Sequence, residues 1–186
     1  MAKTWKDNDI SLDPLKNQTI AVIGYGIQGD AQANNMKDSG LNVIVGLKKG
    51  GPSWKKAESD GHTVMSVSDA CKKADIIHVL LPDMIQSQVY KDEIGPNLSE
   101  GKALSFSHAA AIHWKWIDAP DNVDIIMVAP KGPGSKVRET YLENFGTPSI
   151  VAVHQDFTGK AWDRTLGIAK AIGSARAGLI QTTFQE

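Results

Sequence analysis

The sequence predicts an α/β fold, a doubly wound and mainly parallel sheet with helices on both faces. Short runs rich in Val and Ile alternate with polar stretches of helix length along the chain. Within each run the apolar residues are consecutive rather than alternate, which is typical of strands covered on both faces in a parallel sheet. Repeated strand–helix–strand units joined by right-handed crossovers give a doubly wound sheet.

Six strands and six helices are predicted in alternation. The strands are expected over residues 19–23, 42–47, 75–81, 102–105, 124–129 and 149–153. The helices are expected over residues 30–39, 52–60, 67–74, 85–94, 136–145 and 159–172. No internal repeat or linker interrupts this order, so residues 1–186 are predicted to form a single domain, with residues 1–17 as a lead segment against it.

Composition excludes several classes of protein and partner. With 186 residues, 41% hydrophobic and 22% charged, the chain is neither disordered nor a disulfide scaffold. A net charge of -1 gives no overall attraction to nucleic acid or to a membrane surface, so neither is an expected partner. The single Cys71 and the polar start, without a signal-peptide region, predict a cytoplasmic protein.

A glycine-rich motif follows the first predicted strand and opens the first predicted helix. It reads Gly24-Tyr25-Gly26-Ile27-Gln28-Gly29, a GxGxxG pattern. Gly24 permits the tight turn, Gly26 lets the backbone approach a pyrophosphate, and Gly29 lets helix and strand pack closely. Free N–H groups at the helix start attract the anion. The context favours a Rossmann-type dinucleotide-binding loop over a plain glycine turn.

The end of the second predicted strand favours NADP(H) over NAD(H). An NAD site usually has an acidic residue there, bonded to the ribose hydroxyls. This sequence has Lys48 and Lys49, then Gly51 and Ser53 beside a helix starting at Pro52, and no carboxylate. Lysine charge, a hydroxyl and a helix start suit a 2′-phosphate. The alternative is a solvated turn in which the lysines have no role.

Two further segments follow predicted strands at the sheet edge where such folds bind ligands. Pro82 and Asp83 follow the strand over residues 75–81, and both are also common helix-start residues. His108 follows the strand over residues 102–105 and is the candidate functional histidine. His78, inside an apolar strand, is expected to be a residue of the core or sheet.

Read together, these segments resemble the amino-terminal domain of the ketol-acid reductoisomerase (acetohydroxy-acid isomeroreductase) family. The most specific stretches are VAPKGPG (residues 128–134), LLPD (80–83) and AVHQD (152–156). The resemblance implies an alkyl migration in a 2-hydroxy-2-keto acid, such as 2-acetolactate or 2-aceto-2-hydroxybutyrate, followed by hydride transfer from NADPH with Mg²⁺. It places the enzyme in valine and isoleucine biosynthesis.

The resemblance also implies roles for individual residues. Gly24 and Gly29 would shape the loop, and Tyr25, Gly26, Ile27 and Gln28 would line the pyrophosphate. Lys48, Gly51 and Ser53 would bind the adenosine phosphate. The cofactor site would be completed by Asp83, Met84, Ile85, Gln86 and Gly134. His108 would be the active-site histidine.

The sequence departs from the family pattern at several of these positions. Ile27 replaces the usual Ser, and Asp30 replaces the usual His and is expected to bring a negative charge toward the anion. Lys48 stands where Arg is usual, which keeps the charge but loses bidentate geometry. Ala109 replaces a Gly beside His108.

The family continues beyond this sequence into a helical, knotted domain that carries the Mg²⁺ ligands. No metal site is therefore expected in residues 1–186. An apolar strip including part of 179–184 is expected to stay exposed for docking of that domain or for self-association. Two alternatives remain: another NADP-dependent reductase acting on a small acid without a metal, and a nucleotide-binding module without catalysis.

Overall fold

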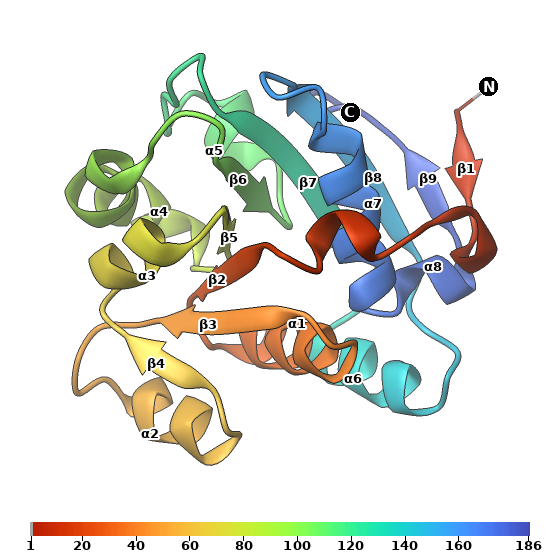
Figure 1. The fold of residues 1–186 in the computed structure, drawn as a ribbon, viewed down its shortest axis with the longest axis horizontal. Helices are drawn as coiled ribbons and strands as arrows, with labels where there is room; N and C mark the ends of the chain where they lie inside the picture. The colour runs from red at the N-terminus through yellow and green to blue at the C-terminus, as the bar shows by residue number, and fades with distance from the viewer. Residues whose placement is uncertain (1) are drawn as a thin grey trace.

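The structure, a computed structural model, describes residues 2–186, so Met1 of the predicted lead segment lies outside the described residues. Among these residues nine strands form one sheet in the order β1-β9-β8-β7-β6-β5-β2-β3-β4 (Figure 1). The strands are β1 (Thr4–Trp5), β2 (Thr19–Ile23), β3 (Asn42–Gly46), β4 (Thr63–Met65), β5 (Ile76–Val79), β6 (Ala103–Phe106), β7 (Asp124–Pro130), β8 (Ser149–Gln155) and β9 (Leu179–Gln181). The helices are α1 (Ile27–Asp38), α2 (Pro52–Ser59), α3 (Val67–Lys73), α4 (Asp83–Val89), α5 (Ala110–His113), α6 (Gly134–Leu142), α7 (Ala161–Ala171) and α8 (Ser174–Ala177).

Six strands, β4-β3-β2-β5-β6-β7, are parallel and make the doubly wound part of the sheet. Their sequence order is that of a dinucleotide-binding fold, which confirms the predicted fold class. The strand order reverses between β2 and β5, and ligands of such folds bind at this switch point, outside the carboxyl ends of the strands. The glycine loop follows β2, and Pro82 follows β5.

The far side of the sheet is not parallel throughout. Strand β8 runs antiparallel to β7, β9 runs parallel to β8, and β1 pairs antiparallel with β9 through Thr4 and Ile180. The lead segment therefore closes one edge of the sheet. Leu15 from this segment is fully buried and fills the space left by the missing side chain of Gly167 in α7.

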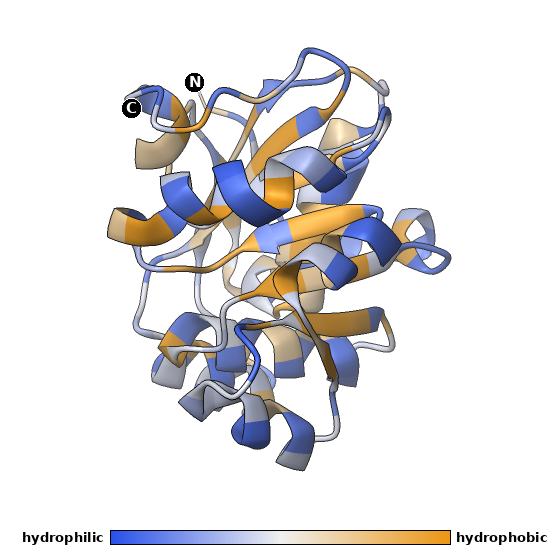
Figure 2. Cartoon of the chain, turned by 90° about the vertical axis from the view of Figure 1, so that its left-hand side faces the viewer, coloured by the Kyte–Doolittle hydropathy of each residue, from blue (hydrophilic) through white to orange (hydrophobic). Residues whose placement is uncertain are grey.

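Both faces of the sheet are covered. Residues of α1, α2, α7 and the lead segment form one apolar cluster. Residues of α3, α5 and the π-helical turn Tyr90–Ile94 form the other. Figure 2 shows the hydrophobic strands inside and the hydrophilic helix surfaces outside. No helix within residues 2–186 combines the length and the apolar character needed to cross a membrane.

All six predicted strands and six predicted helices are present at overlapping positions. Of the apolar strip that was expected to include part of residues 179–184, the structure leaves little exposed. Leu179 is buried in β9 and Phe184 in the core, and only Ile180 is exposed among the large apolar side chains of this segment. Pairing of β9 between β1 and β8 covers this segment, and a reading of local hydrophobicity does not show such a pairing.

Candidate functional site

The three glycines of the loop have the three geometries that a dinucleotide loop requires. Gly24 has a φ of +97°, and a Cβ there would lie 2.9 Å from the Leu80 carbonyl oxygen. A Cβ on Gly29 would collide with the Gly24 carbonyl group. Gly26, just before α1, would meet nothing within 4 Å, so its face is open. The first N–H groups of α1 have no partner within the helix and are free to bind an anion.

An open cleft of about 550 Å³ joins this loop to the second-strand loop. The predicted residues that line it are Gly24, Tyr25, Gly26, Ile27, Gln28, Lys48, Gly51 and Ser53. Three segments far apart in sequence thus meet at the carboxyl edge of β2, β3 and β5. Lys48 and Lys49 are exposed, and neither forms a salt bridge within the described chain.

Sequence reasoning missed Trp54, which also lines the cleft. Its indole N–H donates a 2.8 Å hydrogen bond to Glu58, which fixes the ring on the first turn of α2. The sequence did contain a signal for Trp54: it is an aromatic residue in the first helical turn after a glycine-rich, cationic loop. A flat ring at this place is suited to stacking on a purine base.

Tyr25 lines the cleft, but its hydroxyl is bonded to other parts of the chain. The side chain is buried, and its hydroxyl donates to Asp60 (2.8 Å) and accepts from Asn34 (2.9 Å). Burial, followed by the hydrogen bond to Asp60, raises the pKa of Tyr25. The hydroxyl therefore stays protonated and holds the glycine loop to the segment after α2.

Asp30 does not present its charge to the cleft, which corrects the expectation from the sequence. One carboxylate oxygen accepts from Asn34 at 2.8 Å, and the other pairs with Lys56 at 2.8 Å. The same lysine pairs with Asp60 at 2.9 Å. Hydrogen bonding to Asp30 raises the pKa of Lys56, and hydrogen bonding to Lys56 lowers the pKa of Asp60. The ion pairs join α1 to α2 and neutralise the extra acid.

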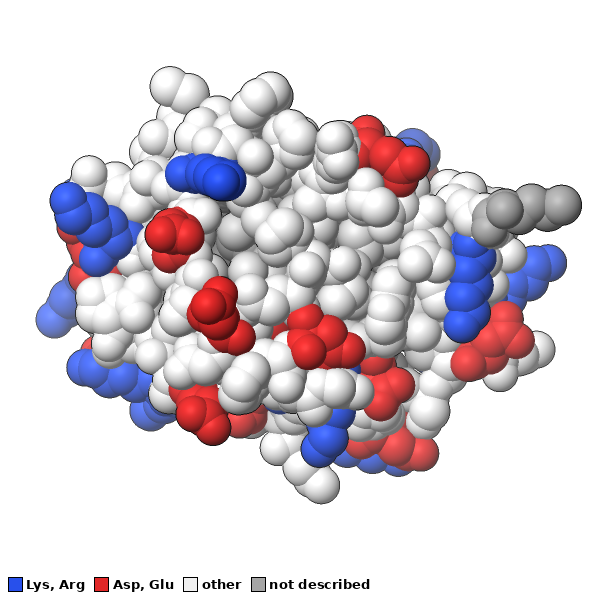
Figure 3. All heavy atoms as spheres, turned by 90° about the horizontal axis from the view of Figure 1, so that it is seen from above, with Lys and Arg blue, Asp and Glu red and all other residues white. Residues whose placement is uncertain are grey.

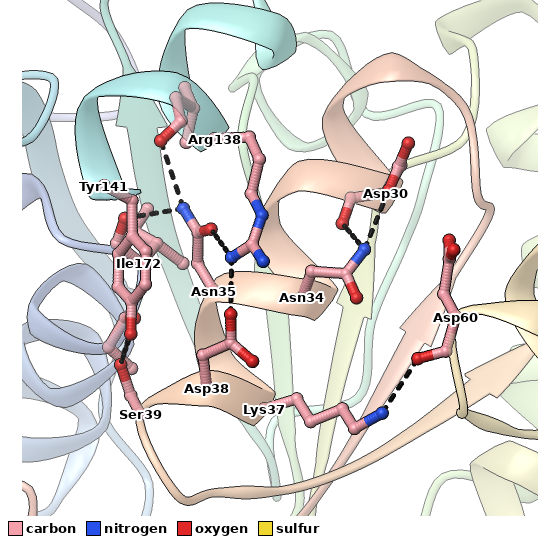
Figure 4. A network of polar contacts seen from close by, with 12 residues as sticks. Asp30, Asn34, Asn35, Lys37, Asp38, Ser39, Asp60, Arg138, Tyr141 and Ile172 are labelled. Carbon is pink, nitrogen blue, oxygen red and sulfur yellow. Dashed lines mark hydrogen bonds and ion pairs between the residues drawn. The ribbon is translucent and has the colours of Figure 1, made fainter. Parts of the chain in front are cut away.

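The rest of α1 is anchored to neighbouring helices, as Figure 4 shows. The buried Asn35 donates to the carbonyl oxygens of Val137 and Ile172 and accepts from Arg138. Arg138 also pairs with Asp38 at 2.7 Å. These contacts hold α1 against α6, so the N-terminal end of α1 is fixed at the cleft.

Gly134, the first residue of α6, lies against the glycine loop. A Cβ there would collide with the Ile27 carbonyl group. Gly134 lines a smaller hollow with Ile27 and Asp30 rather than the 550 Å³ cleft. Close approach of two helix starts therefore explains this glycine.

A second cavity, of about 190 Å³, adjoins the cleft and shares Gln28, Leu80 and Leu81 with it. It brings together Asp83, Gln86, Ser107 and His108, of which all but Ser107 were predicted site residues. The His108 side chain is 68% exposed, and its Nδ1 lies 3.7 Å from an Asp83 carboxylate oxygen. The Ala110 N–H donates to the same nitrogen at 3.3 Å.

The four predicted residues at the start of α4 separate into two groups. Asp83 and Gln86 line the second cavity. Met84, 92% exposed, and Ile85 point to the surface and line neither cavity. Gln86 donates to the Leu81 carbonyl at 2.8 Å and to Asp83 at 3.1 Å, while its buried side-chain oxygen has no partner.

These features fit a dinucleotide. The open face of Gly26 admits a pyrophosphate, the lysines lie at a helix start, and the unpartnered oxygen of Gln86 is an acceptor at the second cavity. The same residues fit a bound metal ion less well than a dinucleotide. Within residues 2–186 no three His, Cys, Asp or Glu side chains are grouped to hold a metal ion.

Comparisons with known proteins agree with this geometry. The family described as "Acetohydroxy acid isomeroreductase, NADPH-binding domain" matches residues 14–178. A "Ketol-acid reductoisomerase (NADP(+))" of Nitrosopumilus maritimus is 86% identical over the whole chain, and one of Cenarchaeum symbiosum is 80% identical. The chain spans 56% of the length of each of these two relatives.

A solved structure is also closely similar. An "NADH-preferring ketol-acid reductoisomerase from an uncultured archean" superposes with a TM-score of 0.96 at 46% identity, over 98% of this chain and 56% of that one. From the match over residues 14–178, the chain belongs to the acetohydroxy acid isomeroreductase family, of which it contains the NADPH-binding domain.

Proposed function

We propose that the chain binds NADP(H) along the carboxyl edge of the sheet, and that the complete protein is a ketol-acid reductoisomerase. The observation that carries the proposal is the continuous cleft from the glycine loop to Lys48, Gly51 and Ser53. In this proposal the pyrophosphate lies over Gly26 and the start of α1, and the nicotinamide enters the cavity beside His108.

The adenosine end supports a 2′-phosphate. No acidic residue follows β3, and Lys48 and Lys49 are exposed and free of salt bridges within the described chain. Gly51 lies just before α2, so the helix start adds N–H groups at the same place. Trp54 provides the surface on which the adenine stacks. One solved relative is named as NADH-preferring, so the proposed preference for NADPH does not rest on similarity to that relative. It rests on the cations of this chain beside the cleft.

The nicotinamide end supports a role for His108 at the reacting groups. When bound, NADPH supplies the hydride of the reduction. The exposed imidazole lies beside the Asp83 carboxylate, which is placed to orient the ring. His108 is thus placed to hold or deliver a proton at the substrate oxygen. The proposed substrates are 2-acetolactate and 2-aceto-2-hydroxybutyrate.

We further propose that another part of the protein docks beside the carboxyl-terminal segment. A cavity of about 720 Å³ lies between the loop after α5, the end of β8 and Phe184. Trp114, 64% exposed, and Trp116 lie on the loop after α5. Figure 3 looks onto this end of the molecule, where an uncharged area is bordered by acidic and basic side chains. Exposed tryptophans beside a cavity are typical of an interface.

Titration tests the cofactor assignment. We expect wild-type chain to bind NADPH more tightly than NADH. Replacing both lysines, Lys48→Ala with Lys49→Ala, is expected to weaken NADPH about 10-fold or more and NADH about 2-fold or less. Lys55→Ala removes a charge from the neighbouring helix α2, outside the cleft, and is the matched control. Equal losses for both cofactors would contradict the assignment.

A turnover assay separates the proposal from its alternatives. The 186-residue chain with 2-acetolactate, NADPH and Mg²⁺ is expected to turn over far more slowly than about one per second, because no carboxylate cluster for a two-metal clamp exists in the described residues. Faster metal-independent turnover of a small acid would favour a different reductase. Cofactor binding by a complete protein that shows no activity would favour a nucleotide-binding module.

A further inference from the structure

A histidine lies buried in the middle of the sheet, where the proposed chemistry does not use it. His78 of β5 is fully buried, and its neighbour across the parallel pair is Ser105 of β6. Its Nδ1 lies 2.8 Å from the Ser105 hydroxyl, and its Nε2 lies 2.8 Å from the side-chain oxygen of Gln32 in α1. Both ring nitrogens are therefore satisfied, as burial in an apolar sheet requires.

The hydrogen bonds continue from this histidine to the cleft. The Gln32 amide nitrogen donates to the Gln28 side-chain oxygen at 3.0 Å and to the Ser107 hydroxyl at 3.1 Å. Gln28 donates in turn to the Gly132 carbonyl at 3.0 Å. Ser107 donates to the Val128 carbonyl at 2.8 Å.

The donors and acceptors of these hydrogen bonds can be assigned in only one way. The Gln32 oxygen only accepts, so the proton of His78 must be on Nε2, and Nδ1 must accept from Ser105. Ser107 donates to a carbonyl and therefore accepts from Gln32. Burial lowers the pKa of His78 to about 4, so the ring is neutral at pH 7, as this arrangement requires.

The two ends of the chain of bonds are walls of the functional site. Gln28 lines both cavities, and Ser107 lines the second cavity with His108. Bonds from both ends of its amide fix the Gln28 side chain, which joins the glycine loop to the loop before α6. Rotation of Gln28 would change the shape of the passage between the cavities.

We propose that His78 is a positioning residue for the nicotinamide half of the dinucleotide, because it orients Gln32, which holds Gln28 and Ser107 at the wall of the cavity beside His108. The inference rests on the proposed function. It predicts that a substitution of His78, which is 0% exposed, weakens binding of the nicotinamide end of the cofactor and leaves binding of the adenosine end unaffected. A purely structural histidine would affect both ends together.

Two probes make this distinction: NADPH, and adenosine 2′,5′-bisphosphate, which carries the adenosine end alone. His78→Leu removes both ring bonds and is expected to weaken NADPH about 10-fold while changing the bisphosphate affinity less than about 2-fold. His78→Gln places an amide N–H where Nε2 was and is expected to restore most of the NADPH affinity.

Ser105→Ala is the matched control, because it removes the other buried hydrogen bond of the same ring, away from the cleft. It is expected to lower thermal stability without changing the ratio of the two affinities. If His78→Leu does not fold, Gln32→Met carries the test, with the same expected split between the probes. Equal weakening of both probes, or the same selective loss in Ser105→Ala, would overturn the inference. A wild-type chain that binds neither probe would overturn the proposed function and this inference with it.

Discussion

At the Lys48 end of the cleft the polar side chains are exposed and charged, whereas at the Gln28–Ser107 end they are bonded to a buried and neutral network. Lys48 and Lys49 are exposed and have no salt-bridge partner in the described chain. Gln28 and Ser107 are each held by two hydrogen bonds that lead to the core. The first end attracts an anion by charge, which salt screens. The second end provides a fixed shape, which depends on packing.

The largest effect is expected where the two ends meet, at the glycine loop. Gly29→Ala forces a methyl group against the Gly24 carbonyl and is expected to lower the free energy of unfolding by more than about 3 kcal/mol. Gly26→Ala has free space and an ordinary negative φ, so it is expected to fold normally yet weaken NADPH. Denaturant unfolding and titration check the pair. Normal stability in Gly29→Ala would contradict the close packing of loop and helix.

A pH titration of stability tests the buried end. The pKa of His78 is about 4 in the folded chain against an ordinary 6.5, so between these values only the unfolded chain binds the proton. The free energy of unfolding therefore has its full value above pH 6.5 and decreases as the pH falls toward 4. The total decrease from this histidine is about 3 kcal/mol.

His78→Gln is the control for this titration and is expected to flatten the curve in that window. A residual slope is expected from His62, whose pKa is lowered by burial. The pKa of Asp60 is lowered below 3.8, so its contribution is lost at lower pH and does not confuse the result. An unchanged slope in His78→Gln would show that the ring is not the group that titrates.

A smaller effect is expected from salt, which should weaken binding at the charged Lys48 end of the cleft. Raising the ionic strength from about 0.05 M to about 0.5 M should weaken NADPH several-fold, because the exposed lysines are screened. NADH lacks the 2′-phosphate and should respond less. Isothermal titration of both cofactors measures the difference, and Lys48→Ala with Lys49→Ala should remove it. Parallel salt dependence of both cofactors would indicate that the pyrophosphate alone carries the electrostatic contribution.

The smallest effect is expected at the ion pairs between α1 and α2. Lys56→Met leaves Asp30 and Asp60 without their cation, but the lysine side chain is 52% exposed. Solvent screening therefore limits the loss of stability to less than about 1 kcal/mol. NADPH is expected to weaken about 2-fold, because an unpaired Asp30 repels the phosphates. Asp30→Asn in the same background should reverse that weakening, and no reversal would place the cause elsewhere.

Most of the parallel sheet and the glycine loop were predictable from sequence because their signals are local. Consecutive β-branched residues report burial on both faces of a strand, and GxGxxG reports a backbone geometry within six residues. The second-strand loop is also local, which is why Lys48, Gly51 and Ser53 were predicted and found on one cleft. Strand β4 was missed because its three residues are only partly buried or exposed and show no apolar run.

The orientation of polar side chains was decided only by the tertiary structure. Asp30 directly follows the glycine motif, and this position predicts a charge near the anion. In the structure its carboxylate pairs instead with Lys56, 26 residues later. Gln32 and His78 are 46 residues apart and meet because the fold brings α1 beside the sheet. The sequence by itself determined most of the parallel strands, the helices between them and the glycine loop, since these depend on neighbouring residues. Which buried polar groups pair, and which segment closes the sheet edge at β9, depends on strand order and burial, which exist only in the folded chain.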